Sequence, residues 1–169
     1  VSIEQAKQLN QHVTNLAKEV ALTYNFDKSI PNNSLLAHRL LHFAKQQGCQ
    51  NKMKERLLQA YFTNGENIGD ITTLSQIAAS LGMDSNEVSA ILNSDAYENE
   101  VQLDQYYAQQ IGVGGVPFFV FNNKYAVSGA QAVETFSEVL GKVYAEMEQE
   151  VIIDNTQDSA ASCDINGQC

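Results

Sequence analysis

The sequence predicts an α/β fold that is mostly helical and ends in a β-hairpin followed by a last helix. Apolar residues recur at steps of three and four over residues 3–111, the spacing of amphipathic helices. A dense β-prone run at 116–121 breaks this spacing, and two asparagines separate it from a second run at 124–127. Helical spacing returns at 131–149, so we expect one domain of mixed class.

The helices before the hairpin are expected to carry apolar stripes that face the core. Glycines follow several of these stripes and predict helix ends at Gly48, Gly82 and Gly112. Asp84 and Glu87 have the spacing of a capping box, which predicts a helix start. Residues 25–33 read as a connection with a short extended piece at 24–27. The predicted helices are residues 3–24, 33–47, 51–63, 72–81, a short helix from Asp84, and 95–111.

Composition excludes several classes of function. The 169 residues carry a formal net charge of −10, which repels phosphate backbones, so nucleic acid is not an expected partner. The longest apolar run, at 116–121, is far shorter than the roughly 20 residues of a membrane-spanning helix. The three cysteines are too few for the disulfide framework of a secreted domain. We therefore expect a cytoplasmic protein without membrane contacts.

The most informative segment is Gly112–Val120, in which Gly114 and Gly115 lead through Val116 to Pro117. A proline at the start of a buried strand must lie where no amide hydrogen is needed, and the glycines permit an unusual turn before it. These residues alone do not decide between a cis and a trans bond at Pro117.

Three segments together resemble the DsbA-like family of FrnE type, in which a thioredoxin fold is interrupted by a helical insertion. They are Gly115–Phe119, Ala126–Gln131 and Ala37–Leu40. The resemblance implies that Pro117 is a cis-proline beside a redox-active dithiol and that Val116 faces the substrate. It divides the chain into a linking helix and loop (1–32), the helical insertion (33–111) and the C-terminal β-β-α part of the thioredoxin-like domain (112–150). The polar composition beyond Ile153 predicts a flexible tail (151–169).

The departure from this family concerns its catalytic motif. Members begin with a strand and a Cys-x-x-Cys motif at a helix N-terminus, where the first thiol has a lowered pKa. No two of the three cysteines here are three positions apart, so no catalytic residue is expected in this chain. We expect a fragment of a longer enzyme; a natural remnant used for binding is the alternative.

The resemblance also bears on Cys163 and Cys169, which match a second cysteine pair of FrnE-type proteins and form a candidate redox pair. The alternative is two exposed thiols without a role. Neither a metal nor a cofactor is expected, because two sulfurs leave zinc two ligands short.

Two histidines, His38 and His42, lie four positions apart and therefore face the same side of one helix. No third metal ligand is evident, so both are expected at the margin of the apolar stripe. The resemblance makes His38 a candidate substrate-binding residue. Cys49, after a helix-ending glycine, is expected to be a structural thiol.

The implied function is dithiol–disulfide exchange on a protein or a small thiol or disulfide substrate. One alternative within the fold is a glutathione-dependent isomerase of the 2-hydroxychromene-2-carboxylate type, which uses a serine in place of the dithiol. Another is a noncatalytic helical binding module. An incomplete sheet exposes strand edges, so self-association through that uncovered sheet is also expected.

Overall fold

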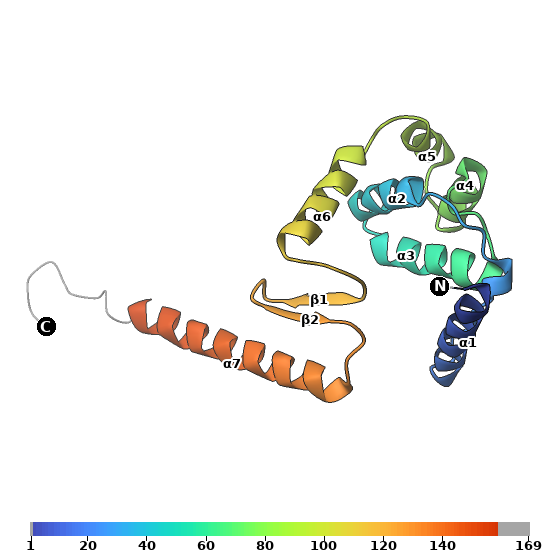
Figure 1. Ribbon diagram of the computed structural model, residues 1–169. Helices are drawn as coiled ribbons and strands as arrows, with labels where there is room; N and C mark the ends of the chain where they lie inside the picture. The colour runs from blue at the N-terminus through green and yellow to red at the C-terminus, as the bar shows by residue number, and fades with distance from the viewer. Residues whose placement is uncertain (1, 159–169) are drawn as a thin grey trace, which may run out of the picture. The chain divides into compact units, whose positions relative to one another are not determined.

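The computed structural model describes the backbone of residues 2–158 and the side chains of residues 2–148. The chain forms two compact units, Val1–Tyr107 and Ala108–Cys169. The first unit is helical, and the second contains an antiparallel hairpin and a long helix (Figure 1). The predicted α/β class with mostly helical content is confirmed.

The helices before the hairpin follow the predicted order, and the last of them, α6, crosses the boundary between the two units. Their bounds are α1 Ile3–Glu19, the 3₁₀-helix η1 Phe26–Lys28, α2 Leu35–Gln46, α3 Gln50–Leu58, the π-helix η2 Gln59–Asn64, α4 Ile71–Ser80, α5 Ser85–Leu92 and α6 Glu98–Gln110.

Side-chain caps define several helix starts. The Asp84 carboxylate accepts hydrogen bonds of 2.9 Å from the amides of Asn86 and Glu87, which satisfies two orphan donors at the start of α5. The structure forms this half of the predicted capping box only. The complete box lies at the start of α1, where Ser2 and Gln5 bond each other's amides at 2.8 and 3.2 Å.

Three predicted elements before the hairpin differ from the structure. The first helix ends at Glu19 rather than at residue 24, because Ala21 adopts φ 61°. The Leu22 amide then bonds the Ala17 carbonyl at 2.8 Å, which closes a Schellman motif with alanine in the usual glycine position. The expected extended piece at 24–27 is wrong, since η1 lies there. The helix predicted at 51–63 divides into α3 and η2.

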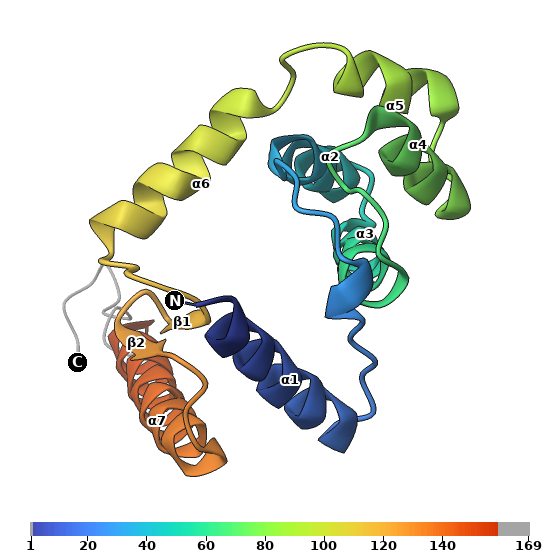
Figure 2. The same ribbon diagram turned by 45° about the vertical axis from the view of Figure 1, so that its right-hand side comes forward.

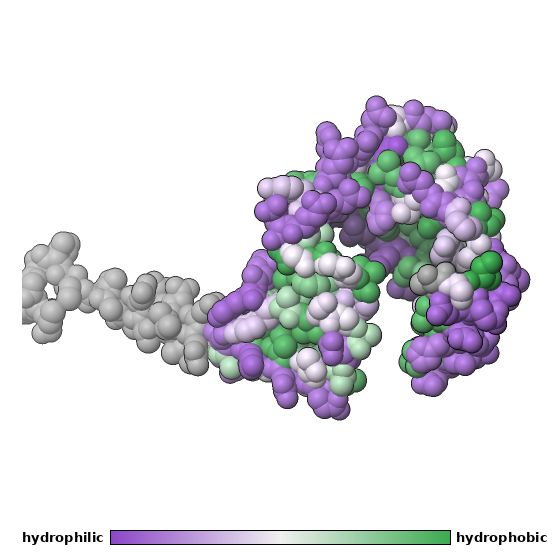
Figure 3. All heavy atoms as spheres, in the orientation of Figure 1, coloured by the Kyte–Doolittle hydropathy of each residue, from purple (hydrophilic) through white to green (hydrophobic). Residues whose placement is uncertain are grey.

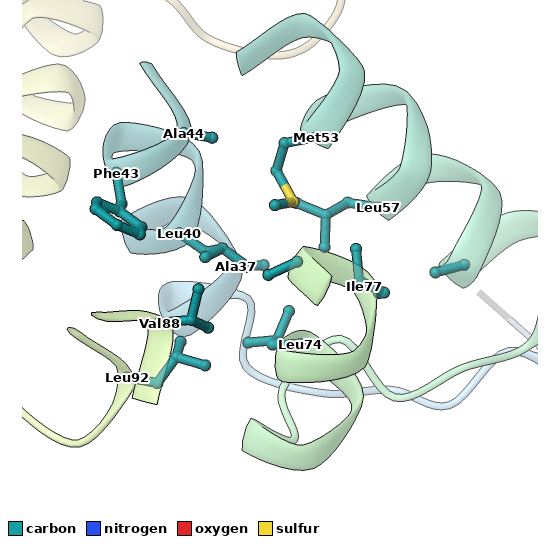
Figure 4. Close-up of a cluster of buried hydrophobic side chains, with 12 residues drawn as sticks. Ala37, Leu40, Phe43, Ala44, Met53, Leu57, Leu74, Ile77, Val88 and Leu92 are labelled. Carbon is teal, nitrogen blue, oxygen red and sulfur yellow. The ribbon is translucent and has the colours of Figure 1, made fainter. Parts of the chain in front are cut away.

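A hydrophobic core joins α2, α3, η2, α4 and α5. The helices α2 and α3 lie side by side, and the side chains in Figure 4 converge between them and α4 and α5. Burial of each large apolar side chain contributes about 1.5–3 kcal/mol, so this cluster is the main source of stability in the first unit. Its buried members are Ala37, Leu40, Phe43, Ala44, Met53, Leu57, Ala60, Leu74, Ile77, Ala78, Val88 and Leu92.

Arg39 is buried beside this core without a carboxylate partner among the described residues. Its guanidinium donates hydrogen bonds to the carbonyls of Ala96, at 2.7 Å, of Ile91, at 2.6 Å, and of Ser94. Cations are favourable near helix C-terminal carbonyls, and these acceptors lie at and after the end of α5. Arg39 therefore holds the connection from α5 to α6 against α2.

The second unit is built on a hairpin of β1, Phe118–Phe121, and β2, Tyr125–Ser128. The register pairs Phe118 with Ser128 and Phe121 with Tyr125. Asn122 and Asn123 lie in the turn as predicted, and both have positive φ, a conformation that asparagine tolerates well. The register also leaves Lys124 in the turn, so β2 begins one residue later than the predicted run. The helix α7, Val133–Asp158, follows the hairpin.

The last helix is longer than predicted. We expected it to end at residue 149 and a flexible tail to begin at 151, but α7 continues to Asp158. Residues 159–169, the rest of that predicted tail, lie outside the described residues.

The apolar stripes of α1 and α7 are more exposed than predicted. In α1, Ile3 is 79% exposed and Leu9 58%, and Ala17 is its buried residue. In α7, Val133 is 74% exposed and Leu140 53%, although the helical spacing of apolar residues at 131–149 would suit a face turned toward a core. The helix α1 contributes no residue to the cluster of α2 to α5, and Figures 1 and 2 show it apart from these helices. Both helices thus present apolar surface that no described element of their own unit covers.

Candidate functional site

The segment between α6 and β1 contains the predicted substrate-binding residues Val116 and Pro117. Gly112 follows α6 and has φ 77°. The chain continues through Gly114 and Gly115, and a Cβ atom added to either glycine would have no neighbouring atom within 4 Å. The peptide bond between Val116 and Pro117 is cis. Residues 114–117, just before the hairpin, are therefore exposed.

Val116 is the most exposed large apolar residue of the described chain, at 89%. The Pro117 carbonyl accepts a 2.8 Å hydrogen bond from the Gly129 amide, which closes the hairpin just after Val116. Among the described residues, no backbone hydrogen bond involves the amide or carbonyl of Val116. Its main chain is thus free to pair with an extended peptide.

The hairpin that carries this segment is fixed to α7 by aromatic contacts. Phe119 and Phe121 place their rings 4.9 and 6.3 Å from the ring of Phe136. Because side chains alternate along a strand, Phe118 and Val120 lie on the opposite face of β1. Figure 3 shows apolar residues gathered on the visible surface of this unit.

A polar cluster also joins the hairpin to α7. The Tyr125 hydroxyl donates to Glu146 Oε1 at 2.5 Å, and Lys124 Nζ donates to Glu146 Oε2 at 2.9 Å. These hydrogen bonds, from Tyr125 first and then from Lys124, lower the pKa of the Glu146 carboxyl. The bond to Glu146 raises the pKa of Tyr125 and of Lys124. The cluster therefore holds one carboxylate between two donors.

The third predicted binding residue, His38, is an exposed residue of α2 in the first unit. It lines a cavity of about 470 Å³ that lies between α2, α3 and η2. Val116 and Pro117 belong to the second unit, so the structure places His38 in a different unit from them.

The second histidine, His42, forms a 2.9 Å contact between its Nε2 and Asp104 Oδ2 of α6. Tyr97 stacks beside its ring, at 6.4 Å between centroids, and donates to Gln46 Oε1. Burial, and then the charge of Glu100, raise the pKa of Tyr97. His42 thus takes part in packing between α2 and α6.

The remaining candidate residues are cysteines. Cys49 is half-buried, lies at the N-cap of α3 and packs against the core, which agrees with a structural role. Cys163 and Cys169, the candidate redox pair, lie outside the described residues. Within the part of the chain that the structure describes, no group of three or more His, Cys, Asp or Glu residues is arranged to hold a metal ion.

Neither the hydrogen-bonding role of Arg39 nor the position of Lys54 beside the cavity was predicted from the sequence. The signal for Arg39 was available, because it lies one turn before Phe43 on the buried stripe of α2, where a charge needs partners. Lys54 carried no signal, since its position beside the cavity depends on how α3 packs against α2.

The fold and the hairpin segment define a thioredoxin-like protein with a helical insertion. The profile of the DSBA-like thioredoxin domain matches residues 2–141. The chain therefore belongs to the DSBA-like thioredoxin domain family. No helix in the described part is long and apolar enough to cross a membrane.

Individual relatives agree with this family. A probable DsbA oxidoreductase from Streptomyces coelicolor is 33% identical with a TM-score of 0.81, over 86% of this chain and 63% of that protein. The uncharacterized protein YwbO of Bacillus subtilis (strain 168) is 25% identical over 74% of this chain and 63% of its own length. A candidate protein disulfide isomerase from Nitrosomonas europaea shares the fold, with a TM-score of 0.67 at 14% identity over 86% of this chain and 76% of that protein. This chain spans about 63% of the length of the first two relatives.

Proposed function

We propose that this chain forms the substrate-binding part of a DsbA-like thiol–disulfide oxidoreductase of FrnE type that acts on protein disulfides. The observation that carries the proposal is the open segment at Val116 and Pro117, with its exposed side chain and its unpaired main chain. Family membership and the name of the Streptomyces coelicolor relative support the reaction class.

In the proposed binding mode, an extended segment of the substrate protein lies along Val116. Main-chain hydrogen bonds supply affinity in this mode, and they do not depend on the sequence of the substrate. The 89% exposed side chain of Val116 adds an apolar contact beside those bonds. Such a surface suits an enzyme that acts on many unfolded proteins.

The proposed reaction is a balanced exchange of two thiols and one disulfide. A thiolate of the enzyme attacks one sulfur of the substrate disulfide, which forms a mixed disulfide and releases one substrate thiolate. A second enzyme thiolate then attacks the mixed disulfide, releases the other substrate thiol and leaves the enzyme oxidised. The reverse sequence oxidises a substrate dithiol.

We place the attacking dithiol in a Cys-x-x-Cys segment outside these 169 residues, because Cys49, Cys163 and Cys169 lack that spacing. Cys163 and Cys169 then serve as a second pair that exchanges with the main dithiol. The small number of cysteines supports a cytoplasmic location.

Substitution of Val116 tests the binding mode in the protein as the cell makes it. For a disulfide-bonded peptide substrate, Val116→Asp should raise KM about tenfold with little change in kcat, because it places a desolvated charge against the substrate. Val133→Asp is the matched control, since Val133 is also an exposed valine of the second unit, at 74%. Equal effects of the two substitutions, or none from Val116→Asp, would reject this binding mode.

A further inference from the structure

The cavity beside His38 has the size and lining of a small-molecule site. Its volume of about 470 Å³ lies within the range of 300–1,000 Å³ that is usual for ligand pockets. Most of its wall is apolar and is contributed by Ala37 and Leu41 of α2, Leu57 and Leu58 of α3, and Ile68.

One wall of this cavity is held in place before any ligand binds. The π-helix η2 supplies Tyr61 and Phe62, and π-helical turns occur frequently at functional sites. The Phe62 ring stacks on Tyr24 at 4.9 Å. The Phe62 carbonyl accepts a 2.7 Å hydrogen bond from the Asn25 amide, and the Thr63 carbonyl one of 2.6 Å from the Asn25 side chain. A preformed wall lowers the cost of binding.

The charges of the cavity contrast with those of the chain. The protein has 20 acidic and 10 basic residues, whereas the cavity is lined by His38 and Lys54 and by no carboxylate. On the same helices, His42 contacts Asp104 and Arg56 contacts Glu66, whereas Arg39, Lys45 and Lys52 have no carboxylate partner among the described side chains. Among the described side chains, His38 and Lys54 form no ion pair.

We propose that this cavity binds a small apolar carboxylic acid, with its carboxylate toward Lys54 and His38 and its hydrocarbon body against Leu41, Leu57 and Ile68. The apolar wall favours the body of such a ligand, and the two unpaired donors favour its charge. All residues that line the cavity belong to the first unit, and the proposal does not rest on the proposed disulfide exchange.

Three eight-carbon probes separate the apolar contribution from that of the charge. Octanoate, 1-octanol and octylammonium are titrated into the ¹⁵N-labelled full chain, and amide shifts report both affinity and location. We expect octanoate to perturb α2 and α3 around the cavity and to bind about fivefold to tenfold more tightly than 1-octanol. Octylammonium should bind more weakly than either.

Substitutions on one helix then test the role of Lys54. Lys54→Gln should reduce the affinity for octanoate to that for 1-octanol, while Lys52→Gln, the same charge change two residues away outside this cavity, should leave it unchanged. Leu41→Ala should reduce the affinity for octanoate and the affinity for 1-octanol by the same factor, because it removes apolar contact alone. The amide spectrum of each variant shows that it is folded.

Several results would overturn the site. They are equal affinities for octanoate and 1-octanol, equal losses from Lys54→Gln and Lys52→Gln, shifts that map outside the cavity, and no binding of octanoate at millimolar concentration. None of these results bears on whether the protein exchanges disulfides, so the two proposals fail separately.

Discussion

The two units of this protein differ in how they treat their apolar residues. The first unit encloses a cluster in which Leu40, Met53 and Leu74 are completely buried. In the second unit Val127 is the buried hydrophobic residue of the described part, while Val116, Val133 and Leu140 are each more than half exposed. Both units have apolar stripes of similar appearance in the sequence.

This difference separates apolar residues that stabilise a fold from those available for contacts. Buried residues of the first unit contribute to the free energy of unfolding through the area they remove from water. Exposed residues of the second unit contribute little to it and leave surface for a substrate, another part of the protein or a second copy.

The largest expected effect is the contrast between two leucine truncations. Leu74→Ala in α4 should lower the free energy of unfolding by about 2–5 kcal/mol, because it empties a fully enclosed site. Leu140→Ala in α7, at 53% exposure, should change it by about 0.5 kcal/mol or less. Urea denaturation followed by circular dichroism at 222 nm measures both. Similar losses would show that Leu140 is buried in solution.

The next effect concerns the buried guanidinium of the first unit. Arg39→Met should lower the free energy of unfolding by about 2–4 kcal/mol, since it leaves the carbonyls of Ala96, Ile91 and Ser94 without their charged donor. Arg56→Met is the control, because Arg56 is less buried and its contact with Glu66 is 3.6 Å. We expect Arg56→Met to lower the free energy of unfolding by about 0–1 kcal/mol. If Arg39→Met left the free energy of unfolding unchanged, the role of Arg39 in holding the connection from α5 to α6 would be contradicted.

A smaller effect is expected from the uncovered face of β1. Val120 is 45% exposed on the face opposite Phe119 and Phe121, so we expect the chain to associate weakly through this face. Val120→Lys should weaken that association about tenfold, and Val133→Lys on α7 should not. Sedimentation velocity over a range of concentrations measures it. A wild-type chain that stays monomeric at all concentrations would refute the prediction.

The smallest effect is the pH dependence of the contact between the hairpin and α7. The folded pKa of Glu146 is lowered from 4.5, so its contribution is present above that value and is lost as the pH falls through the folded pKa. The folded pKa values of Tyr125 and Lys124 are raised from 10.0 and 10.5, so their contributions are present below these values and are lost as the pH rises through the folded ones.

Amide hydrogen exchange in β2 against pH measures this contact. Glu146→Gln should remove the loss of protection on the acidic side, whereas Glu138→Gln, elsewhere on α7, should retain it. The effect is small because the cluster is accessible to solvent. An unchanged profile in Glu146→Gln would show that another group controls it.

Local signals in the sequence predicted much of the fold. Gly48, Gly82 and Gly112 were expected to end helices, and each has positive φ just after a helix. The end of α1 was missed because Ala21 occupies the same position in its Schellman motif, and alanine gives no signal there. The division of α3 from η2 was missed because the apolar residues of 57–62 suit an α-helix and a π-helix equally.

Burial and the site were less predictable, since both depend on contacts between distant residues. The stripes of α1 and α7 indicated helices correctly, but a stripe does not show whether its own unit supplies a partner. Val116 and Pro117 were identified from the resemblance, and their roles remain predictions. The pocket around His38 and Lys54 required α2, α3 and η2 to be placed together.

The central claim, that this chain belongs to an enzyme that exchanges protein disulfides, is tested most directly by insulin reduction. The protein is isolated as the cell makes it, its intact mass is measured, and its rate is compared with that of the 169-residue chain. We predict that the cellular protein carries a Cys-x-x-Cys pair and reduces insulin catalytically, and that the 169-residue chain does not. A cellular protein without that pair and without reductase activity, or with glutathione-dependent isomerisation of 2-hydroxychromene-2-carboxylate instead, would contradict the claim.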